Sequence, residues 1–177
     1  MTLSGQRVAL LIEDEYQVLE AWYPKLRLEE AGAQVSVIGS GTKKRYDSKE
    51  HYPMDVDAAA GEVIAADFDA VVVPGGFAPD NMRLHPEMID LVRDIHHDGK
   101  LVAAICHGGW MLVSAGVLKG GRRATGYLPI RHDVENAGGV WVDEPVVEDG
   151  NVITSRTPAD LPAFGAALVS YLERNNS

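Results

Sequence analysis

The sequence predicts an α/β fold, a flavodoxin-like or Rossmann-like three-layer sandwich around a central parallel sheet. Two observations predict it: short apolar runs recur along the chain, and helical stretches separate them. The runs are almost continuously hydrophobic, which is typical of parallel strands that helices cover on both faces. Strand–helix–strand units at this spacing pair in parallel through right-handed crossovers. The four predicted strands are residues 8–12, 35–38, 70–73 and 101–105.

The elements of the first half follow in order. A helical stretch over residues 19–31 joins the first two strands and ends at Gly32, where a glycine commonly terminates a helix. A second helical stretch, over residues 86–97, joins the third and fourth strands and is again closed by a glycine. Segment 40–69, between the second and third predicted strands, does not follow this alternation of strand and helix. It is rich in charge and then alternates in hydropathy around residues 54–58, which predicts a short hairpin or an edge excursion.

The second half of the chain predicts shorter elements. A helix over residues 110–115 follows the fourth strand, and Gly120-Gly121 marks a turn. The remaining expected elements are a short strand over 125–127, a helix over 130–137, a hairpin of 146–147 with 152–154 around an Asp149-Gly150 turn, and a terminal helix over 158–172 with Pro158 near its first turn. Since no repeat or linker interrupts the pattern, residues 1–177 are expected to form a single domain.

Composition limits the classes of partner. The chain is 46% hydrophobic and 24% charged, which is ordinary for a globular protein. Its net charge of −10 and pI near 4.9 argue against nucleic acid and anionic membranes as partners. One cysteine excludes an internal disulfide and fits a reducing compartment. Residues 1–7 lack a signal-peptide layout and no apolar stretch reaches the length of a membrane span, so we expect a cytoplasmic protein.

The single cysteine, Cys106, stands where a predicted strand passes into a predicted helix. A nucleophile at such a turn is exposed above the sheet edge, and the sharp turn favours small residues two positions before and after it. Those residues here are Ala104 and Gly108. The N-terminus of the following helix favours a thiolate, and the adjacent His107 supplies a cation or a base. The alternative is a small buried hydrophobic residue, but the surrounding motif favours a reactive thiol.

Polar residues follow three of the predicted strands at their carboxyl ends, where open α/β sheets bind ligands. They are Glu13, Asp14, Glu15 and then Glu20 after the first strand, Gly75-Gly76 after the third, and Cys106-His107 after the fourth. If these strands are neighbours, the three turns converge. The amides of Gly75 and Gly76 would then face an oxyanion beside Cys106, although the same pair also fits a plain tight turn.

No cofactor motif accompanies these residues. A G-x-G-x-x-G fingerprint after a strand and a Walker sequence are both absent from the sequence. His85, His96 and His97 lack metal-ligand spacing with other donors, and we interpret them as surface residues of a helix. We therefore expect neither a metal nor an organic cofactor, and the missing phosphate loop weakens the interpretation as a flavodoxin-like binding domain.

Several motifs, in this order along the chain, resemble one family. They are Glu20 four residues before Pro24, the turn over 73–80, Cys106-His107-Gly108, and the segments 114–118, 136–138, 141–143 and 154–158. Together they resemble the PfpI branch of the PfpI/ThiJ superfamily over residues 7–172. The resemblance implies a flavodoxin-like sandwich of the class I glutamine-amidotransferase type, in agreement with the strand pattern.

The resemblance also implies roles for individual residues. Cys106 would be the reactive group, and Glu20 would be protonated and hydrogen-bond the thiolate, which requires a raised carboxyl pKa. His107 would pair with an acid from a neighbouring subunit. Asp80 stands at the position of that acid, where many members carry glutamate. Tyr127 would place an aromatic hydroxyl over the pocket.

Two further expectations concern the oligomeric state and one position at which this sequence differs from the family pattern. An acid shared between subunits implies a homo-oligomer, a dimer or a hexamer. Gln17 stands where relatives often carry a second acid, and Glu15 is the substitute if the helix start is shifted.

Two classes of function remain open. In the first, Cys106 is the nucleophile of an enzyme, either a peptidase or amidase or a glyoxalase or deglycase, acting on a peptide or a small-molecule carbonyl substrate. In the second, the protein is a redox or stress sensor or a chaperone, in which Cys106 is oxidised through sulfenic to sulfinic acid because no second cysteine can resolve it. Substrate turnover distinguishes the two classes.

Overall fold

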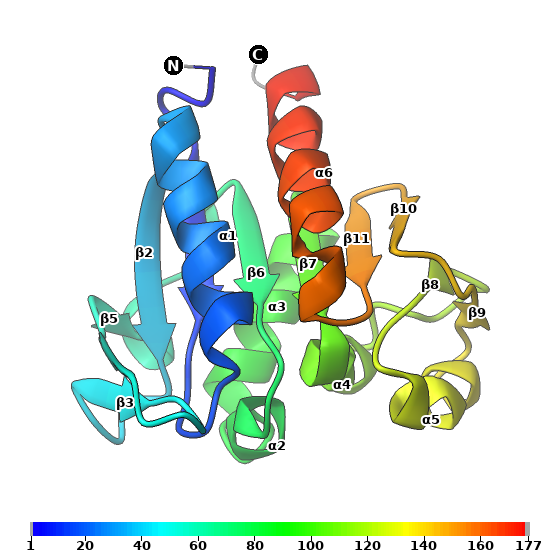
Figure 1. Cartoon of the computed structure of the whole chain (residues 1–177), viewed down its shortest axis with the longest axis horizontal. Coiled ribbons are helices and arrows are strands. Elements are labelled where there is room, and N and C mark those ends of the chain that lie inside the picture. The colour runs from blue at the N-terminus through cyan, green and yellow to red at the C-terminus, as the bar shows by residue number, and fades with distance from the viewer. Residues whose placement is uncertain (1, 176–177) are drawn as a thin grey trace.

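A seven-stranded sheet forms the centre of the molecule, and the computed structural model describes residues 2–175. The strand order is β10-β11-β7-β6-β1-β2-β5, and only β10 runs antiparallel to its neighbour (Figure 1). Its strands are β1 (Arg7–Leu11), β2 (Gln34–Gly39), β5 (Ala58–Ala59), β6 (Ala70–Val73), β7 (Leu101–Ile105), β10 (Val146–Asp149) and β11 (Val152–Ser155). The predicted flavodoxin-like sandwich is confirmed, with an antiparallel strand at one edge.

Helices cover both faces of this sheet. On one face α1 (Val18–Ala31) and α6 (Leu161–Arg174) lie side by side, in front of the strands in Figure 1. On the other face α3 (Pro86–His97) and α4 (Gly109–Ser114) pack against β7. Shorter elements are α2 (Ala78–Met82), α5 (Arg131–Asn136) and the 3₁₀ turns Ala60–Glu62, Ala65–Asp67, Cys106–Gly108, Leu128–Ile130 and Pro158–Asp160.

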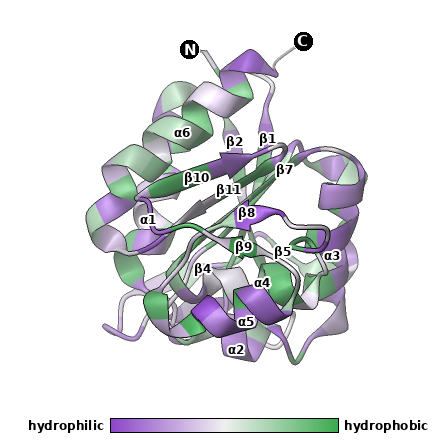
Figure 2. Cartoon of the chain, turned by 90° about the vertical axis from the view of Figure 1, so that its right-hand side faces the viewer, coloured by the Kyte–Doolittle hydropathy of each residue, from purple (hydrophilic) through white to green (hydrophobic). Residues whose placement is uncertain are grey.

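Burial follows the hydrophobic pattern of each element. Every residue of β6 and β7 is buried, as expected for strands covered on both faces. On α3 the buried residues are Met88, Leu91, Val92 and Ile95, the spacing of one helix face. The helices α4 and α5 differ in burial because they differ in composition. Figure 2 shows that α4 is largely hydrophobic and α5 largely hydrophilic, and Val134 is the one buried residue of α5.

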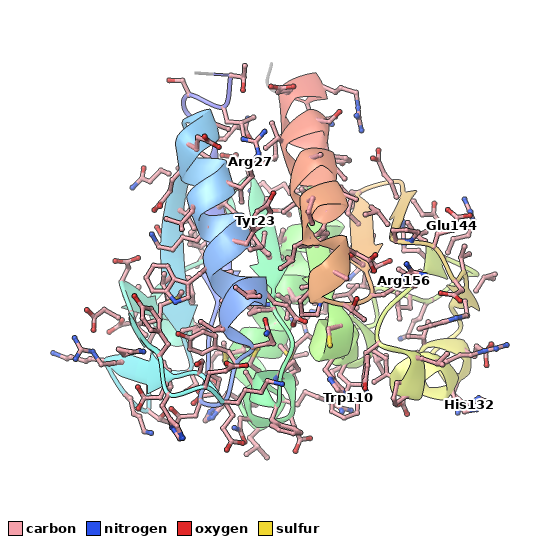
Figure 3. All side chains as sticks on the ribbon, in the orientation of Figure 1. Tyr23, Arg27, Trp110, His132, Glu144 and Arg156 are labelled. Carbon is pink, nitrogen blue, oxygen red and sulfur yellow. The ribbon has the colours of Figure 1, made fainter. Side chains whose placement is uncertain are left out.

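A glycine allows α1 and α6 to approach closely. A Cβ atom at Gly165 would lie 2.8 Å from the ring of Tyr23 and 3.4 Å from the side chain of Arg27. Figure 3 shows both labelled side chains in the space between the two helices. This close approach joins α1, near the start of the chain, to α6 at its end.

The charged segment after β2 forms both a hairpin and an edge strand, the two alternatives that the sequence left open. β3 (Arg45–Asp47) and β4 (Pro53–Asp55) pair antiparallel, and β5 adds to the edge of the main sheet beside β2. The turn between β3 and β4 lies close to the start of α1, because the backbone N–H of Lys49 donates to the carbonyl of Tyr16. The hairpin therefore covers the carboxyl end of β1.

The predicted strand over residues 125–127 is wrong. The strand in this region is β8 (Arg123–Ala124), which pairs in parallel with β9 (Val140–Trp141) in a separate two-stranded sheet. The amide of Thr125 donates instead to the hydroxyl of Thr154, at 2.9 Å, and the amide of Tyr127 donates to the carbonyl of Cys106, at 3.3 Å. These bonds draw the segment over the turn that carries the cysteine.

The C-terminal hairpin is confirmed, with its turn displaced by one residue. Asp149 pairs with Val152, so the two turn residues are Gly150 and Asn151 rather than the Asp149-Gly150 pair. Gly150 has a φ of 59°, which a glycine adopts without steric cost at the first position of such a turn. The side-chain amide of Asn151 donates to the carbonyls of His96 and Lys100, which fixes the hairpin to the end of α3.

Candidate active site

Cys106 sits in a strained turn between β7 and α4. Its φ is 60°, one of three positive values among non-glycine residues of the described chain, and its exposure is 8%. A backbone conformation of this kind persists only where the surroundings hold it, and it is often found at active sites. The turn packs so tightly on the end of β6 that a Cβ atom at Gly108 would lie 2.4 Å from the carbonyl oxygen of Val73.

We therefore expect Gly108→Ala to be strongly destabilising. The added methyl group overlaps backbone that cannot move without disturbing β6, so the free energy of unfolding should fall by roughly 1–3 kcal/mol. Chemical denaturation measures this loss. Gly61→Ala is the matched control, because its nearest neighbour would be a flexible Glu87 side chain at 3.7 Å. Equal stability of the two variants would contradict the packing described for the turn.

Glu20 is placed beside Cys106 by the first turn of α1. The side-chain oxygen of Gln17 caps the helix by accepting the Glu20 amide at 2.8 Å, and the Glu20 side chain is fully buried. Its Oε2 accepts the amide of Gly75 at 2.8 Å. A Cβ atom at Gly75 would lie 2.5 Å from that oxygen and 2.8 Å from the Cβ of Cys106. Gly75 is thus the residue that allows the carboxyl group and the cysteine to meet.

Burial governs the protonation of this pair. It raises the pKa of Glu20 to about 7, and it raises the pKa of the Cys106 thiol to about 12, with the neighbouring Glu20 charge as the next cause. The backbone amides of His107 and Gly76 face the sulfur and oppose that rise. Because burial and Glu20 outweigh these amides, the resting pair favours the thiol over the thiolate that the helix N-terminus alone predicts. The two groups compete for one proton.

His107 lies between two aromatic rings. Its Nδ1 is 3.6 Å from the sulfur of Cys106, and its ring centroid is 4.9 Å from that of Tyr127 and 5.0 Å from that of Trp110. Burial first, and then the charge of Lys49, lowers the pKa of His107, which favours a neutral ring able to accept a proton. Trp110 is anchored by a 2.9 Å bond from its indole N–H to Asp133, and Figure 3 shows it at the carboxyl edge of the sheet.

A cavity of about 400 Å³ opens over these groups. Five of the predicted site residues line it, since β1, β6 and β7 are neighbours and their following turns converge as expected. The complete lining is Gln17, Glu20, Lys49, Gly76, Phe77, Cys106, His107, Tyr127, Thr157 and Pro158. A larger hollow of about 690 Å³ lies beyond β2, but no cysteine or histidine lines it. The chemistry therefore belongs to the smaller cavity.

Some predicted residues have other places or roles. The amide of Gly75 donates its hydrogen bond to Glu20 and is therefore not free to bind an oxyanion. The amides that face the sulfur are those of Gly76 and His107. Asp80 is exposed on α2 and does not line the cavity of its own chain, so its service to a neighbouring subunit stays a prediction. Glu15 borders a separate hollow and does not replace the second acid. Trp110 contacts the His107 ring without lining the cavity.

Sequence reasoning missed two parts of the lining. Thr157 and Pro158 stood in a motif of the resemblance, but nothing in their residue types indicated contact with the cysteine. Lys49 stood in a run of charged residues and was interpreted only as part of a hairpin. No group of three histidine, cysteine or acidic side chains within residues 2–175 is arranged to hold a metal ion.

The fold and the cysteine turn define an α/β protein of the nucleophile-elbow class. The chain matches the DJ-1/PfpI family model over residues 6–171 and belongs to that family. It is 42% identical over 167 residues to the deglycase PfpI of Pyrococcus furiosus, covering 94% of this chain and 99% of that one. It is 37% identical over 169 residues to the putative cysteine protease YraA of Bacillus subtilis, covering 96% and 99%.

A solved structure shows the same architecture. A two-domain protein from Anabaena variabilis, with DJ-1/ThiJ/PfpI-like and ferritin-like domains, superposes with a TM-score of 0.91 at 43% identity. The match covers 94% of this chain and 48% of that chain. Within residues 2–175, no helix combines the length and the apolar character needed to cross a membrane.

Proposed function

We propose that this protein is a cysteine-dependent deglycase, which hydrolyses dicarbonyl adducts of thiols and amines and converts free methylglyoxal to lactate. The observation that carries the proposal is a buried carboxyl group, Glu20, with a pKa of about 7 beside Cys106. A group that is half ionised near neutral pH both accepts and returns protons, which this reaction requires. The deglycase names of relatives support the proposal.

The reaction uses one nucleophile and one proton carrier. The thiol proton passes to Glu20 as the sulfur adds to the aldehyde carbon of methylglyoxal, and Glu20 then returns that proton to the resulting oxyanion, which faces the amides of Gly76 and His107. With an adduct, the sulfur instead displaces the substrate thiol or amine from the same carbon, and the displaced group leaves with that proton. Glu20, again ionised, then moves a proton from this carbon to the adjacent carbonyl carbon, so that the first is oxidised while the second is reduced. Water finally releases the hydroxy acid from the sulfur. Methylglyoxal plus one water gives lactic acid, and no external oxidant is consumed.

The cavity suits a small adduct. Its volume of about 400 Å³ falls at the lower end of the range of small-molecule sites. Phe77, Tyr127 and Pro158 supply apolar walls, and the polar groups converge on the sulfur. A short side chain carrying a dicarbonyl adduct fits such a site better than a long extended peptide.

A peptidase is the second candidate, and one observation favours it. The 3.6 Å contact between the Cys106 sulfur and His107 Nδ1 resembles a cysteine–histidine pair, in which the histidine accepts the thiol proton. A relative is named a putative cysteine protease. In this version Asp80 of a second copy orients His107, so the activity depends on a homo-oligomer.

The test is to incubate the purified protein with methylglyoxal, and with N-acetylcysteine previously treated with methylglyoxal, and to measure lactate and recovered thiol. Lactate with thiol recovery supports the deglycase. Cleavage of a fluorogenic peptide without lactate formation would contradict the deglycase proposal and support the peptidase. Addition of two oxygen atoms to Cys106 under peroxide, with no turnover of any of these substrates, replaces the deglycase with the redox sensor.

A further inference from the structure

Lys49 is an unpaired cation on the lining of the cavity that contains Cys106. It lies in the turn between β3 and β4, is exposed, and lines the same cavity as Cys106. Its ammonium nitrogen lies 5.9 Å from the ring centroid of Phe77, another lining residue. Within residues 2–175 this ammonium makes no hydrogen bond or ion pair, whereas Lys25 is paired with Glu29 and Lys43 with Asp14.

The charge of Lys49 reaches the reacting groups. It is the single lysine or arginine among the lining residues. It lowers the pKa of Glu20 and that of His107 through space, so its ammonium lies within electrostatic range of both. In a chain with a net charge of −10, Lys49 places a positive charge on the lining of this cavity.

The neighbouring acids form no ion pair with Lys49, although the charge of Glu50 opposes that of Lys49 at Glu20, where it raises the pKa. The carboxylate of Glu50 accepts the amide of Val18 at 3.2 Å, at the start of α1. Lys49 also borders a neighbouring hollow with Asp47 and Glu15, yet it forms no ion pair with either. The ammonium lies over the Phe77 ring at a cation–π distance, which keeps it at the edge of the cavity with its N–H groups available to a ligand.

We propose that Lys49 is a specificity-determining residue that binds a carboxylate carried by the substrate close to its reacting carbonyl. This rests on the proposed deglycase activity and narrows its substrate class to dicarbonyl adducts of molecules with a free carboxylate, such as an amino acid. The ammonium ion would orient the adduct with the carbon that carries the thiol or amine over Cys106. Neutral adducts would enter the same cavity without this contact.

Alkylation of Cys106 tests the binding of an anion without any turnover. Iodoacetate and iodoacetamide transfer the same type of carbon to the sulfur and release iodide, and they differ in carrying a carboxylate or an amide. The readout is the ratio of their rates, in which changes of thiol ionisation cancel. We expect Lys49→Gln to lower the iodoacetate to iodoacetamide ratio roughly five-fold, the effect of one unit charge a few ångströms away across water. High salt should reduce the wild-type ratio toward that of the variant.

Lys44→Gln is the matched control, because it removes the same charge from an exposed lysine that lines the hollow beyond β2 instead. Its ratio should equal that of the wild type, and Lys49→Arg should restore most of the selectivity. An unchanged ratio in Lys49→Gln would overturn the proposal. So would an equal fall in both glutamine variants, since that would reflect net charge alone.

Turnover then tests the substrate class. Methylglyoxal adducts of N-acetylcysteine and of its methyl ester differ in one carboxylate. We expect kcat/KM of the wild type to favour the acid over the ester and Lys49→Gln to abolish the preference, mainly through KM. Equal values in the wild type would overturn the carboxylate preference. Absence of lactate from both adducts would instead contradict the proposed deglycase activity. The alkylation ratio would still test whether Lys49 binds a carboxylate, because it requires no turnover.

Discussion

Serine in place of Cys106 is expected to abolish lactate formation while the protein remains folded. A hydroxyl group is nearly isosteric with the thiol but ionises far less readily, so the addition to the carbonyl carbon should slow by about 10³-fold or more. Serine also keeps a Cβ atom at a position whose φ is 60°, so it adds no new backbone strain. Lactate release is the measurement, with circular dichroism and thermal unfolding as evidence of the fold.

The paired control for this variant is the hydrolase assay. If Cys106→Ser loses lactate formation and peptide cleavage together, the cysteine is the nucleophile of both. Turnover retained at more than a tenth of the wild-type rate would show that Cys106 is not the nucleophile. The strained turn would then need another explanation, such as the packing of Gly108 against β6.

Glutamine in place of Glu20 is expected to separate thiol reactivity from catalysis. The amide oxygen of glutamine can still accept the Gly75 amide, so the turn should keep its geometry. Removing the carboxylate removes a cause that raises the pKa of Cys106, and alkylation by iodoacetamide near pH 8 should become faster. Turnover should nevertheless fall by about 10²-fold or more, because the variant lacks the group that carries a proton between the two reacting carbons. An unchanged alkylation rate across pH would show that Glu20 does not control the thiol.

Stability against pH provides an independent measure of the same carboxyl group. Its pKa rises from 4.5 to about 7 on folding, so the folded state holds the proton more tightly than the unfolded chain. This contribution is complete below pH 4.5 and is lost as the pH rises through about 7. The stability of the wild type relative to Glu20→Gln should therefore decline by about 3 kcal/mol across that window. Denaturation of both variants at pH 4.5, 6 and 8 measures the decline.

The sheet and the cysteine turn were predictable because their signals are local. The continuous apolar runs of β6 and β7 reflect burial on both faces, and Ala104 and Gly108 reflect crowding within one turn. The strand predicted over 125–127 was wrong because its residue types suit a strand, while its amides bond to Thr154 and Cys106, far away in the sequence. Local residue types do not reveal such partners.

The raised pKa of Glu20 was expected from the family resemblance, but the ionisation of the thiol was not predictable from the cysteine turn alone, for the same reason. A helix N-terminus after Cys106 suggested a thiolate, but burial and the arrival of Glu20 from another element raise the pKa of the thiol. Lys49 reaches the cavity only because the β3–β4 hairpin folds over the end of β1. Its charge run was visible in the sequence, and its position beside the sulfur depends on tertiary structure.

The hydrogen bond from Gly75 to Glu20 makes one backbone group a spectroscopic reporter of the site. The amide of Gly75 donates to the carboxyl group of Glu20, the proposed proton carrier of the reaction. Its NMR chemical shift should therefore follow the ionisation of Glu20, with a midpoint near pH 7 in the wild type and no such step in Glu20→Gln. The same resonance should move when a substrate draws the proton from the carboxyl group. The charge state of the site could thus be followed during turnover without a label on any catalytic side chain.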